Sequence, residues 1–174
     1  MEVKKYKDME QMKKETFIVM GGDDNCKYGV ERQNCIAFKK DHPDAVIPTK
    51  AEPGATGYDL VSVEEIIINP GEFKMVSTGL KWEAVGYDMT VRPRSGLAAK
   101  HGVTVLNTPG SIDSSYRGVI KVILINHSKE LFKVEKGMRI AQAVFHKVED
   151  VLIGEVEELT ETIRGEGGFG STGK

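Results

Sequence analysis

The sequence predicts a single all-β domain, and three observations support this prediction. The chain has 174 residues, a length that suits one domain. Hydrophobic residues make up 40% of it and charged residues 29%, a balance that allows a globular protein with an apolar core. From residue 34 onward, short runs of β-branched and aromatic residues alternate with turn residues. This spacing indicates a β-sandwich or barrel and disfavours a fold in which strands alternate with helices.

The expected elements follow from these runs. Turn residues such as Asn69-Pro70-Gly71 and Thr108-Pro109-Gly110 separate the strands. We expect one short helix over Ser95–Lys100, because Ser95 is a good N-cap residue at its start. The expected strands are Cys35–Phe38, Glu65–Ile68, Phe73–Ser77, Asp88–Arg92, Val103–Leu106, Val119–Asn126, Ile140–Lys147 and Leu152–Val156.

The first 33 residues have a different character. Tyr6, Met9 and Met12 recur at a spacing of three and allow a short amphipathic helix among many lysines. Thr16–Met20 then predicts a strand that ends at the turn-forming residues 21–25. We find no chemical motif in this extension.

Charge and cysteine content exclude several classes of function. The net charge is −2, which predicts neither a nucleic-acid partner nor a membrane-surface partner. No apolar run approaches the roughly 18 residues of a spanning helix, and the N-terminus lacks the apolar core of a signal peptide. Cys26 and Cys35 have no histidine partner at zinc-site spacing. We therefore expect reduced thiols in a cytoplasmic protein, or also a nuclear one if the source is eukaryotic.

The last eleven residues, 164–174, contain five glycines, two hydroxyl side chains, two cations and the ring of Phe169. Glycines disfavour a helix or strand and let successive N–H groups point at one anion. This composition suits a flap that closes on a nucleotide, although composition alone fits a disordered tail equally well. Gly168–Lys174 also matches the Walker A pattern, but no Ser or Thr and no helix follow Lys174, so we do not expect a P-loop.

Two further clusters suggest phosphate chemistry. Arg94 and Ser95 stand where the helix is expected to begin, and a guanidinium beside a helix N-terminus can bind a phosphate. An ordinary cap with a solvated arginine is the alternative. Pro53–Leu60 combines two glycines with Asp59, a pattern that alone favours a plain loop entering a strand.

Two more clusters lie in the C-terminal half. Asn107–Gly118 connects two expected strands as a long hairpin. Within it, Asn107 offers a donor and an acceptor that suit a base edge, and Asp113 follows an apolar residue, so it is expected at the rim of a pocket. The alternative is an ordinary hairpin loop in which the aspartate forms an Asx-turn with the nearby backbone. In Gly137–Gln142, the amide of Gln142 stands in an otherwise apolar strand and needs a partner.

Together these clusters resemble the five motifs of the trimeric dUTP pyrophosphatase (dUTPase) family, in order and at family-like spacing. The matching segments are Pro53–Leu60, Pro93–Leu97, Asn107–Gly118, Gly137–Gln142 and Arg164–Gly173. The resemblance covers about residues 34–174 and implies a distorted β-barrel or jelly roll with one short helix and a flexible C-terminal tail. It also implies a homotrimer whose three active sites each take residues from all three subunits. The implied divisions are an extension over 1–33, a β-barrel domain over 34–163 and a glycine-rich flap over 164–174.

The resemblance assigns roles residue by residue. Asp113 matches the carboxylate that activates water, and Asp59 matches a carboxylate that supports the water and metal network. Tyr116 matches the ring that packs on the deoxyribose and disfavours a 2′-hydroxyl. The uracil is implied to be read by Asn107 and the hairpin backbone at Gly110 and Ile112. Phosphate contacts are implied for Arg94, Ser95, Gly96 and Gln142. The flap is implied to close with Arg164, Phe169, Gly170, Ser171 and Thr172.

The implied reaction is hydrolysis of dUTP to dUMP and pyrophosphate, which keeps uracil out of DNA and supplies dUMP for dTMP synthesis. The implied cofactor is Mg²⁺, held mainly by substrate phosphates and waters rather than by protein ligands. The sequence departs from the usual family pattern at Ser115 and Met138, where aspartates are common. Neither position carries assigned chemistry, so we expect activity to survive.

Two alternatives remain at this stage. A dCTP deaminase would share the fold, but it needs a catalytic glutamate and residues 107–118 contain none. A dUTP-binding regulator without turnover is disfavoured because Asp113 and the complete tail are both present.

Overall fold

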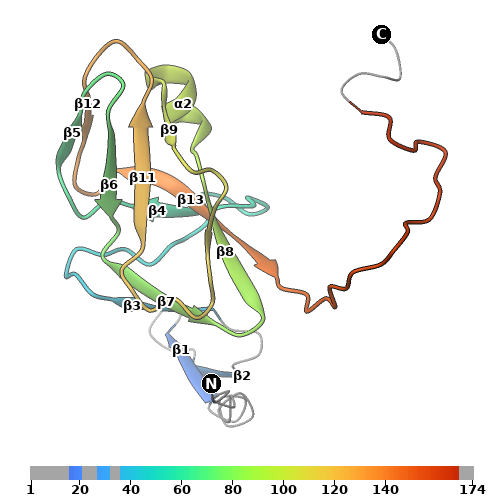
Figure 1. Cartoon of the computed structure of the whole chain (residues 1–174). Coiled ribbons are helices and arrows are strands. Elements are labelled where there is room, and N and C mark those ends of the chain that lie inside the picture. The colour runs from blue at the N-terminus through green and yellow to red at the C-terminus, as the bar shows by residue number, and fades with distance from the viewer. Residues whose placement is uncertain (1–15, 21–26, 32–35, 169–174) are drawn as a thin grey trace, which may run out of the picture.

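The computed structural model describes residues 16–20, 27–31 and 36–168. It is mainly β, as the sequence predicts (Figure 1). The strands are β1 (Thr16–Met20), β2 (Lys27–Glu31), β3 (Ile36–Lys40), β4 (Tyr58–Val61), β5 (Ile66–Ile68), β6 (Phe73–Ser77), β7 (Leu80–Ala84), β8 (Tyr87–Arg92), β9 (Val103–Val105), β10 (Gly110–Ile112), β11 (Lys121–Asn126), β12 (Phe132–Val134) and β13 (Arg139–Lys147). The helix α2 covers Ser95–His101.

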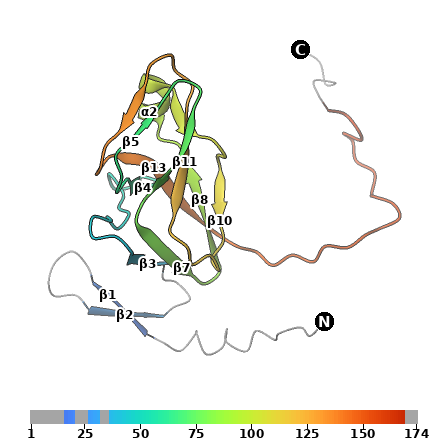
Figure 2. The same cartoon turned by 60° about the vertical axis from the view of Figure 1, so that its left-hand side comes forward.

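The strands form small antiparallel sheets that enclose one apolar core, a distorted jelly roll (Figures 1 and 2). The largest sheet has the order β10-β8-β13-β4, and a second has the order β6-β11-β9. The pairs β12-β5 and β3-β7 complete the body, and β1 pairs with β2. Because β8 and β13 are central, β4 and β10 form the two edges of this sheet, and the chain passes from the end of β8 into α2.

The core follows the alternation of side chains along the strands. In β7, Leu80, Trp82 and Ala84 are buried while the charged residues between them are not. The ring of Trp82 lies 6.1 Å from that of Phe145 in β13, measured between centroids. The long strand β11 likewise buries every second residue. This alternation fixes the register of β7 and β11, because a shift by one residue would turn their apolar side chains away from the common core.

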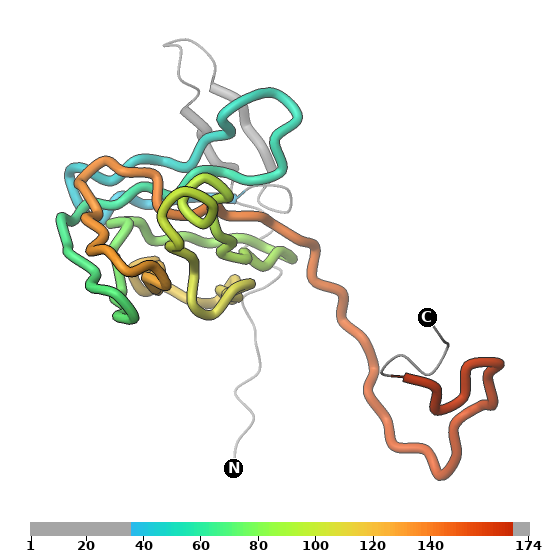
Figure 3. Tube along the Cα trace, turned by 90° about the horizontal axis from the view of Figure 1, so that it is seen from above, coloured from blue at the N-terminus to red at the C-terminus, as the bar shows by residue number. Residues whose placement is uncertain are grey.

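One expected strand is wrong. Leu152–Val156 is not a strand, and Leu152 and Ile153 are fully exposed. The segment after β13 runs away from the folded body without a neighbouring strand to pair with (Figure 3). Its β-branched residues favour an extended backbone, but a strand also needs a hydrogen-bonding partner.

The strands β2, β7, β10 and β12 were not expected, and β4 was anticipated only as the strand that the Pro53–Leu60 loop enters. The short ones are set by pairing with β8, β13 or β5 rather than by their own composition. The proposed cap is also wrong. Arg94 is the N-cap residue, no side chain caps the helix, and Ser95 is its first residue.

At the N-terminus, the strand Thr16–Met20 is confirmed, and it pairs with Lys27–Glu31. The helix expected around Tyr6–Met12 and the two cysteines lie outside the described residues.

Candidate active site

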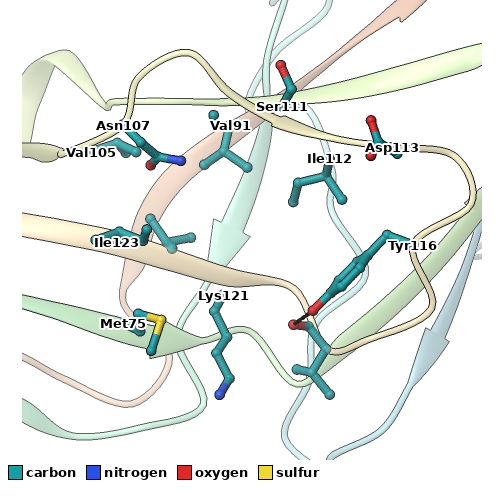
Figure 4. Close-up of a pocket in the computed structure, with 13 residues that line it drawn as sticks. Met75, Val91, Val105, Asn107, Ser111, Ile112, Asp113, Tyr116, Lys121 and Ile123 are labelled. Atoms are coloured by element: carbon teal, nitrogen blue, oxygen red, sulfur yellow. Dashed lines mark hydrogen bonds between the residues drawn. The ribbon is translucent and has the colours of Figure 1, made fainter.

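A pocket opens between the hairpin after β9 and the strand β11, with a cavity volume of about 300 Å³ (Figure 4). The hairpin supplies most of the polar lining, β11 adds Lys121, and β6, β8, β9 and β11 supply apolar side chains. The lining residues are Met75, Val91, Val105, Asn107, Gly110, Ser111, Ile112, Asp113, Tyr116, Val119, Lys121, Val122 and Ile123. The sequence prediction that Asp113 lies at a pocket is confirmed.

The turn between Asn107 and β10 contains a glycine with little room for a side chain. Gly110 is buried, and a Cβ added to it would lie 2.8 Å from Nδ2 of Asn107. A larger residue at position 110 would therefore displace the Asn107 amide from its place against the hairpin backbone. Gly110 also begins β10, which pairs with β8 opposite Val91. This pairing holds β10, and with it this part of the hairpin, against the sheet that contains β8 and β13.

Tyr116 forms one wall of the pocket, and Gly118 makes room for it. Its hydroxyl donates a hydrogen bond to the carbonyl of Val119 at 3.3 Å (Figure 4). A Cβ on Gly118 would lie 2.3 Å from that hydroxyl oxygen. Arg117 donates to the carbonyls of Ser114 and Tyr116. The hairpin thus fixes the ring while leaving 45% of the residue exposed.

Asp113 is exposed, and among the described residues its carboxylate has no hydrogen-bond partner. Only its backbone is fixed, because its carbonyl accepts a hydrogen bond from the Tyr116 N–H at 3.0 Å. A fixed backbone with an unpaired carboxylate leaves both oxygens available to a ligand or a water molecule.

A second cluster of charged groups lies where β4, β8 and β13 meet. Asp59 Oδ1 lies 3.1 Å from Arg94 Nε, and Asp59 Oδ2 lies 3.0 Å from Arg139 Nη1. Nη1 of Arg94 also donates to the backbone carbonyl of Arg139 at 3.1 Å. We call these three residues the arginine–aspartate cluster.

Gln142 lies beside this cluster, because it pairs with Asp59 across the sheet. Its amide needed a partner, and Nε2 donates to the carbonyl of Pro93 at 2.8 Å. A Cβ on Gly57 would lie 2.0 Å from Oε1 of Gln142, so the glycine of the first motif makes room for this side chain. Ser95 and Gly96 are exposed at the first turn of α2, next to Arg94.

The C-terminal segment lies apart from both groups of residues. Arg164 is exposed, and its Nε donates to the carbonyl of Gly167 at 2.8 Å within a local turn. The segment that carries it extends away from the body (Figures 1 and 3). Phe169, Gly170, Ser171 and Thr172 lie outside the described residues.

The candidate residues of one chain thus form two separate groups. Asn107, Gly110, Ile112, Asp113 and Tyr116 line the pocket. None of Asp59, Arg94, Ser95, Gly96 or Gln142 lines it.

Sequence reasoning missed three residues of these two groups: Gly57, Gly118 and Arg139. Their only signal was their presence within the motif segments, because neither a close contact across strands nor a partner 80 residues away is visible in one sequence.

Residues 43–173 match the family model described as dUTPase. The chain belongs to the dUTPase family. Curated relatives named deoxyuridine 5′-triphosphate nucleotidohydrolase agree with this assignment. The relative from Nautilia profundicola is 58% identical over 140 residues, 80% of this chain and 99% of that protein. The relative from Clostridioides difficile is 56% identical over 79% of this chain and 97% of that protein.

Solved structures give the same result for the fold. The Staphylococcus bacteriophage 80alpha dUTPase with dUPNHPP is 26% identical and superimposes with a TM-score of 0.74, covering 81% of this chain and 99% of that chain. The dUTPase from phage phi11 of S. aureus, whose study describes the coordination of a structural Mg(II) ion, superimposes with a TM-score of 0.68 at 20% identity, over 74% of this chain and all of that chain.

These similarities establish the class of activity. As a member of the dUTPase family, the chain is a hydrolase of nucleotide metabolism that acts on dUTP. Among the described residues, no helix has the length and apolar character that crossing a membrane requires.

Proposed function

We propose that the hairpin pocket binds the deoxyuridine of dUTP and that Asp113 activates the water that releases pyrophosphate. The observation that carries this proposal is the composition of the pocket. A cavity of about 300 Å³ combines the amide of Asn107, the ring of Tyr116 and the carboxylate of Asp113, which has no partner among the described residues, with a mainly apolar lining that also includes Ser111 and Lys121. Small-molecule sites have this character of an apolar cavity with a few polar groups.

Base recognition is proposed for Asn107 and for the hairpin backbone at Gly110 and Ile112. The amide of Asn107 carries both donors and an acceptor, which suits the edge of uracil. Cytosine presents an amino group in place of a carbonyl, so one donor that the bound base covers would lose its partner, at a cost of roughly 1–3 kcal/mol. The narrow hairpin would leave no room for the 5-methyl group of thymine. Tyr116 would pack on the deoxyribose and disfavour a 2′-hydroxyl.

Asp113 is proposed as the general base. Its carboxylate would orient and deprotonate a water molecule for in-line attack on the α-phosphorus, with pyrophosphate as the leaving group. The exposed, unpaired carboxylate supports this role, because no competing hydrogen bond from a described residue would have to break first. The product dUMP would then supply dTMP synthesis, and removal of dUTP would keep uracil out of DNA.

The triphosphate is proposed to bind at the arginine–aspartate cluster and its neighbours. Arg94, the exposed first turn of α2 at Ser95 and Gly96, and the amide of Gln142 would donate hydrogen bonds to phosphate oxygens. Asp59 would support this surface rather than touch the reacting atoms, since both its carboxylate oxygens already pair with guanidinium groups.

Magnesium is proposed as a cofactor that arrives with the substrate. Among the described residues, no three His, Cys, Asp or Glu side chains gather closely enough to hold a metal ion. An ion held by phosphate oxygens and waters would need no such cluster. When bound, the ion would neutralise part of the charge of the leaving pyrophosphate.

A homotrimer with shared sites is proposed from the separation of the two groups of residues. The pocket of one subunit would face the arginine–aspartate cluster of a second, and a third would lend its tail. The segment after β13 supports this, because its large apolar side chains are exposed in one chain. These side chains are Val151, Leu152, Ile153, Val156, Leu159 and Ile163. Apolar side chains gathered on one exposed segment indicate a contact with another surface.

The same proposal gives residues 164–174 the role of a flap. Arg164, Phe169, Gly170, Ser171 and Thr172 would close over the nucleotide, with the ring on uracil and the other groups on the γ-phosphate. Residues 34–163 would then be the β domain, and 1–33 an extension without a role in catalysis. A cytoplasmic location remains a prediction of the sequence.

Mixing two inactive variants tests the shared site. Asp113→Asn lacks the base, and truncation after Thr162 lacks the flap. After subunit exchange, verified with differently tagged chains, some sites would combine a sound Asp113 with a sound tail from different chains. We expect dUTP turnover to reappear in the mixture. If it stays absent although exchange is complete, each site is built within one chain and the trimer proposal is wrong.

A further inference from the structure

Arg139 belongs to the arginine–aspartate cluster, but the proposal above assigns it no contact with the phosphates. It is the first residue of β13, and its guanidinium lies 3.0 Å from Asp59 Oδ2 while its side chain remains 51% exposed. A half-exposed ion pair contributes little to stability. The position of Arg139 therefore calls for an explanation other than holding the fold together.

A bulge in β13 turns Arg139 toward Asp59. In the pairing with β4, Ala141 faces Leu60 but Arg139 faces Val61, so Ile140 is an extra residue. In a regular β13 without this bulge, strict alternation would put Arg139 on the same face as the buried Ala141. With it, Ile140 and Ala141 are both buried, and Arg139 joins the face that carries Asp59.

The outcome is a fixed orientation for Arg94. Its Nε contacts Asp59 Oδ1, and its Nη1 donates to the carbonyl of Arg139. Two contacts made from different edges of a planar guanidinium leave little freedom of rotation. No other described residue takes the remaining N–H donors of Arg94, which leaves them to a ligand.

The charges of the three side chains also favour binding of an anion. Asp59 alone with Arg94 would give a neutral pair, which attracts a phosphate weakly. Arg139 brings a second positive charge to the same carboxylate, so the three side chains together carry a net charge of +1. The cluster can therefore satisfy Asp59 and still attract an anion.

We propose that Arg139 is a positioning residue for phosphate binding: it holds Asp59 and so orients Arg94 toward the triphosphate. This inference rests on the proposed role of Arg94. It predicts that Arg139 contributes to binding of the phosphates and not of the nucleoside.

The test compares two ligands that differ in their phosphates. In Arg139→Gln, we expect affinity for the non-hydrolysable analogue dUpNHpp to fall about tenfold, and affinity for 2′-deoxyuridine to change less than about twofold. KM for dUTP is expected to rise by a similar factor. Arg139→Lys keeps the charge and should recover part of the loss. In the double variant, Arg139→Gln should add less than about twofold to the loss caused by Arg94→Gln, because Arg139 acts through Arg94.

Lys133→Gln is the matched control. Lys133 is 50% exposed and pairs with Glu65 at 3.6 Å, away from both groups of site residues, so this variant should bind both ligands normally. Unchanged dUpNHpp binding in Arg139→Gln, an equal loss for deoxyuridine, or additive losses in the double variant would each overturn the inference. A wild-type chain that fails to hydrolyse dUTP would instead overturn the proposed function.

Discussion

Gly118→Ala tests whether the position of Tyr116 matters for catalysis. A Cβ at residue 118 would lie 2.3 Å from the Tyr116 hydroxyl oxygen and 2.5 Å from Cζ. Since ordinary contacts of a Cβ begin at 3.4 Å, the ring must move by about 1 Å (3.4 minus 2.3). The backbone of Gly118 is not in the left-handed region, so the alanine adds no backbone strain and the effect is steric.

The magnitudes follow from this displacement. Moving the ring breaks the hydrogen bond from Tyr116 to the carbonyl of Val119, which contributes about 1 kcal/mol to the free energy of unfolding. A shift of about 1 Å in a group that positions substrate can cost up to about 100-fold in rate. We therefore expect kcat/KM for dUTP to fall between about tenfold and 100-fold, and the preference for dUTP over UTP to fall with it.

Steady-state kinetics with dUTP and UTP measure both quantities, and chemical denaturation measures stability. Ser115→Ala is the control, because Ser115 is an exposed residue of the same hairpin without an assigned role. A Gly118→Ala variant that folds and keeps the wild-type ratio of dUTP to UTP activity would refute the assignment of Tyr116 to the sugar.

Three further predictions address the base, the phosphate side and acid stability. Asp113→Asn should lower kcat by about 100- to 10,000-fold, with stability and dUpNHpp affinity almost unchanged, and retention of more than about a tenth of the rate would exclude Asp113 as the base. Gly57→Ala should displace Gln142 and reduce the free energy of unfolding by about 2 kcal/mol, as measured by urea denaturation; a wild-type value would mean that Gln142 moves aside freely. The hydrogen bond from Lys74 holds the pKa of Glu72 below its usual value, so its stabilising contribution is present at neutral pH and is lost as pH falls through the folded-state pKa. Glu72→Gln should therefore be destabilising at pH 7 and much less so at a pH below the folded-state pKa of Glu72, and an equal effect at both would show that the charge is irrelevant.

The fold class could be predicted from the sequence because the strands carry their own signals. Phe73–Ser77 and Val103–Val105 combine β-branched residues with turn residues on either side, and both are strands in the structure. Gly110–Ile112 could not be found in this way, because a glycine-led run becomes a strand only through its pairing with β8. Leu152–Val156 shows the converse, since its composition favours a strand but the single chain provides no partner.

The candidate site was predictable in composition but not in arrangement. Asp113 and Tyr116 were found because a carboxylate and a ring after an apolar residue suggest a pocket, and both line one. Arg139 was missed because its place depends on one extra residue in β13, which changes the face that it occupies. Such a bulge has no signature in the alternation of the sequence, since Ile140 and Ala141 read simply as apolar residues.

The most direct test of the account is pyrophosphate release from four nucleotides under the same conditions. With magnesium present, we predict rapid release from dUTP and at least about a hundredfold lower kcat/KM for dCTP, dTTP and UTP, because the pocket is proposed to read the base, the 5-position and the 2′-position together. Asp113→Asn should remove the dUTP activity in the same assay. Comparable release from dUTP and dCTP, or a dUTP rate that survives Asp113→Asn, would contradict the claim that this hairpin pocket is the catalytic centre.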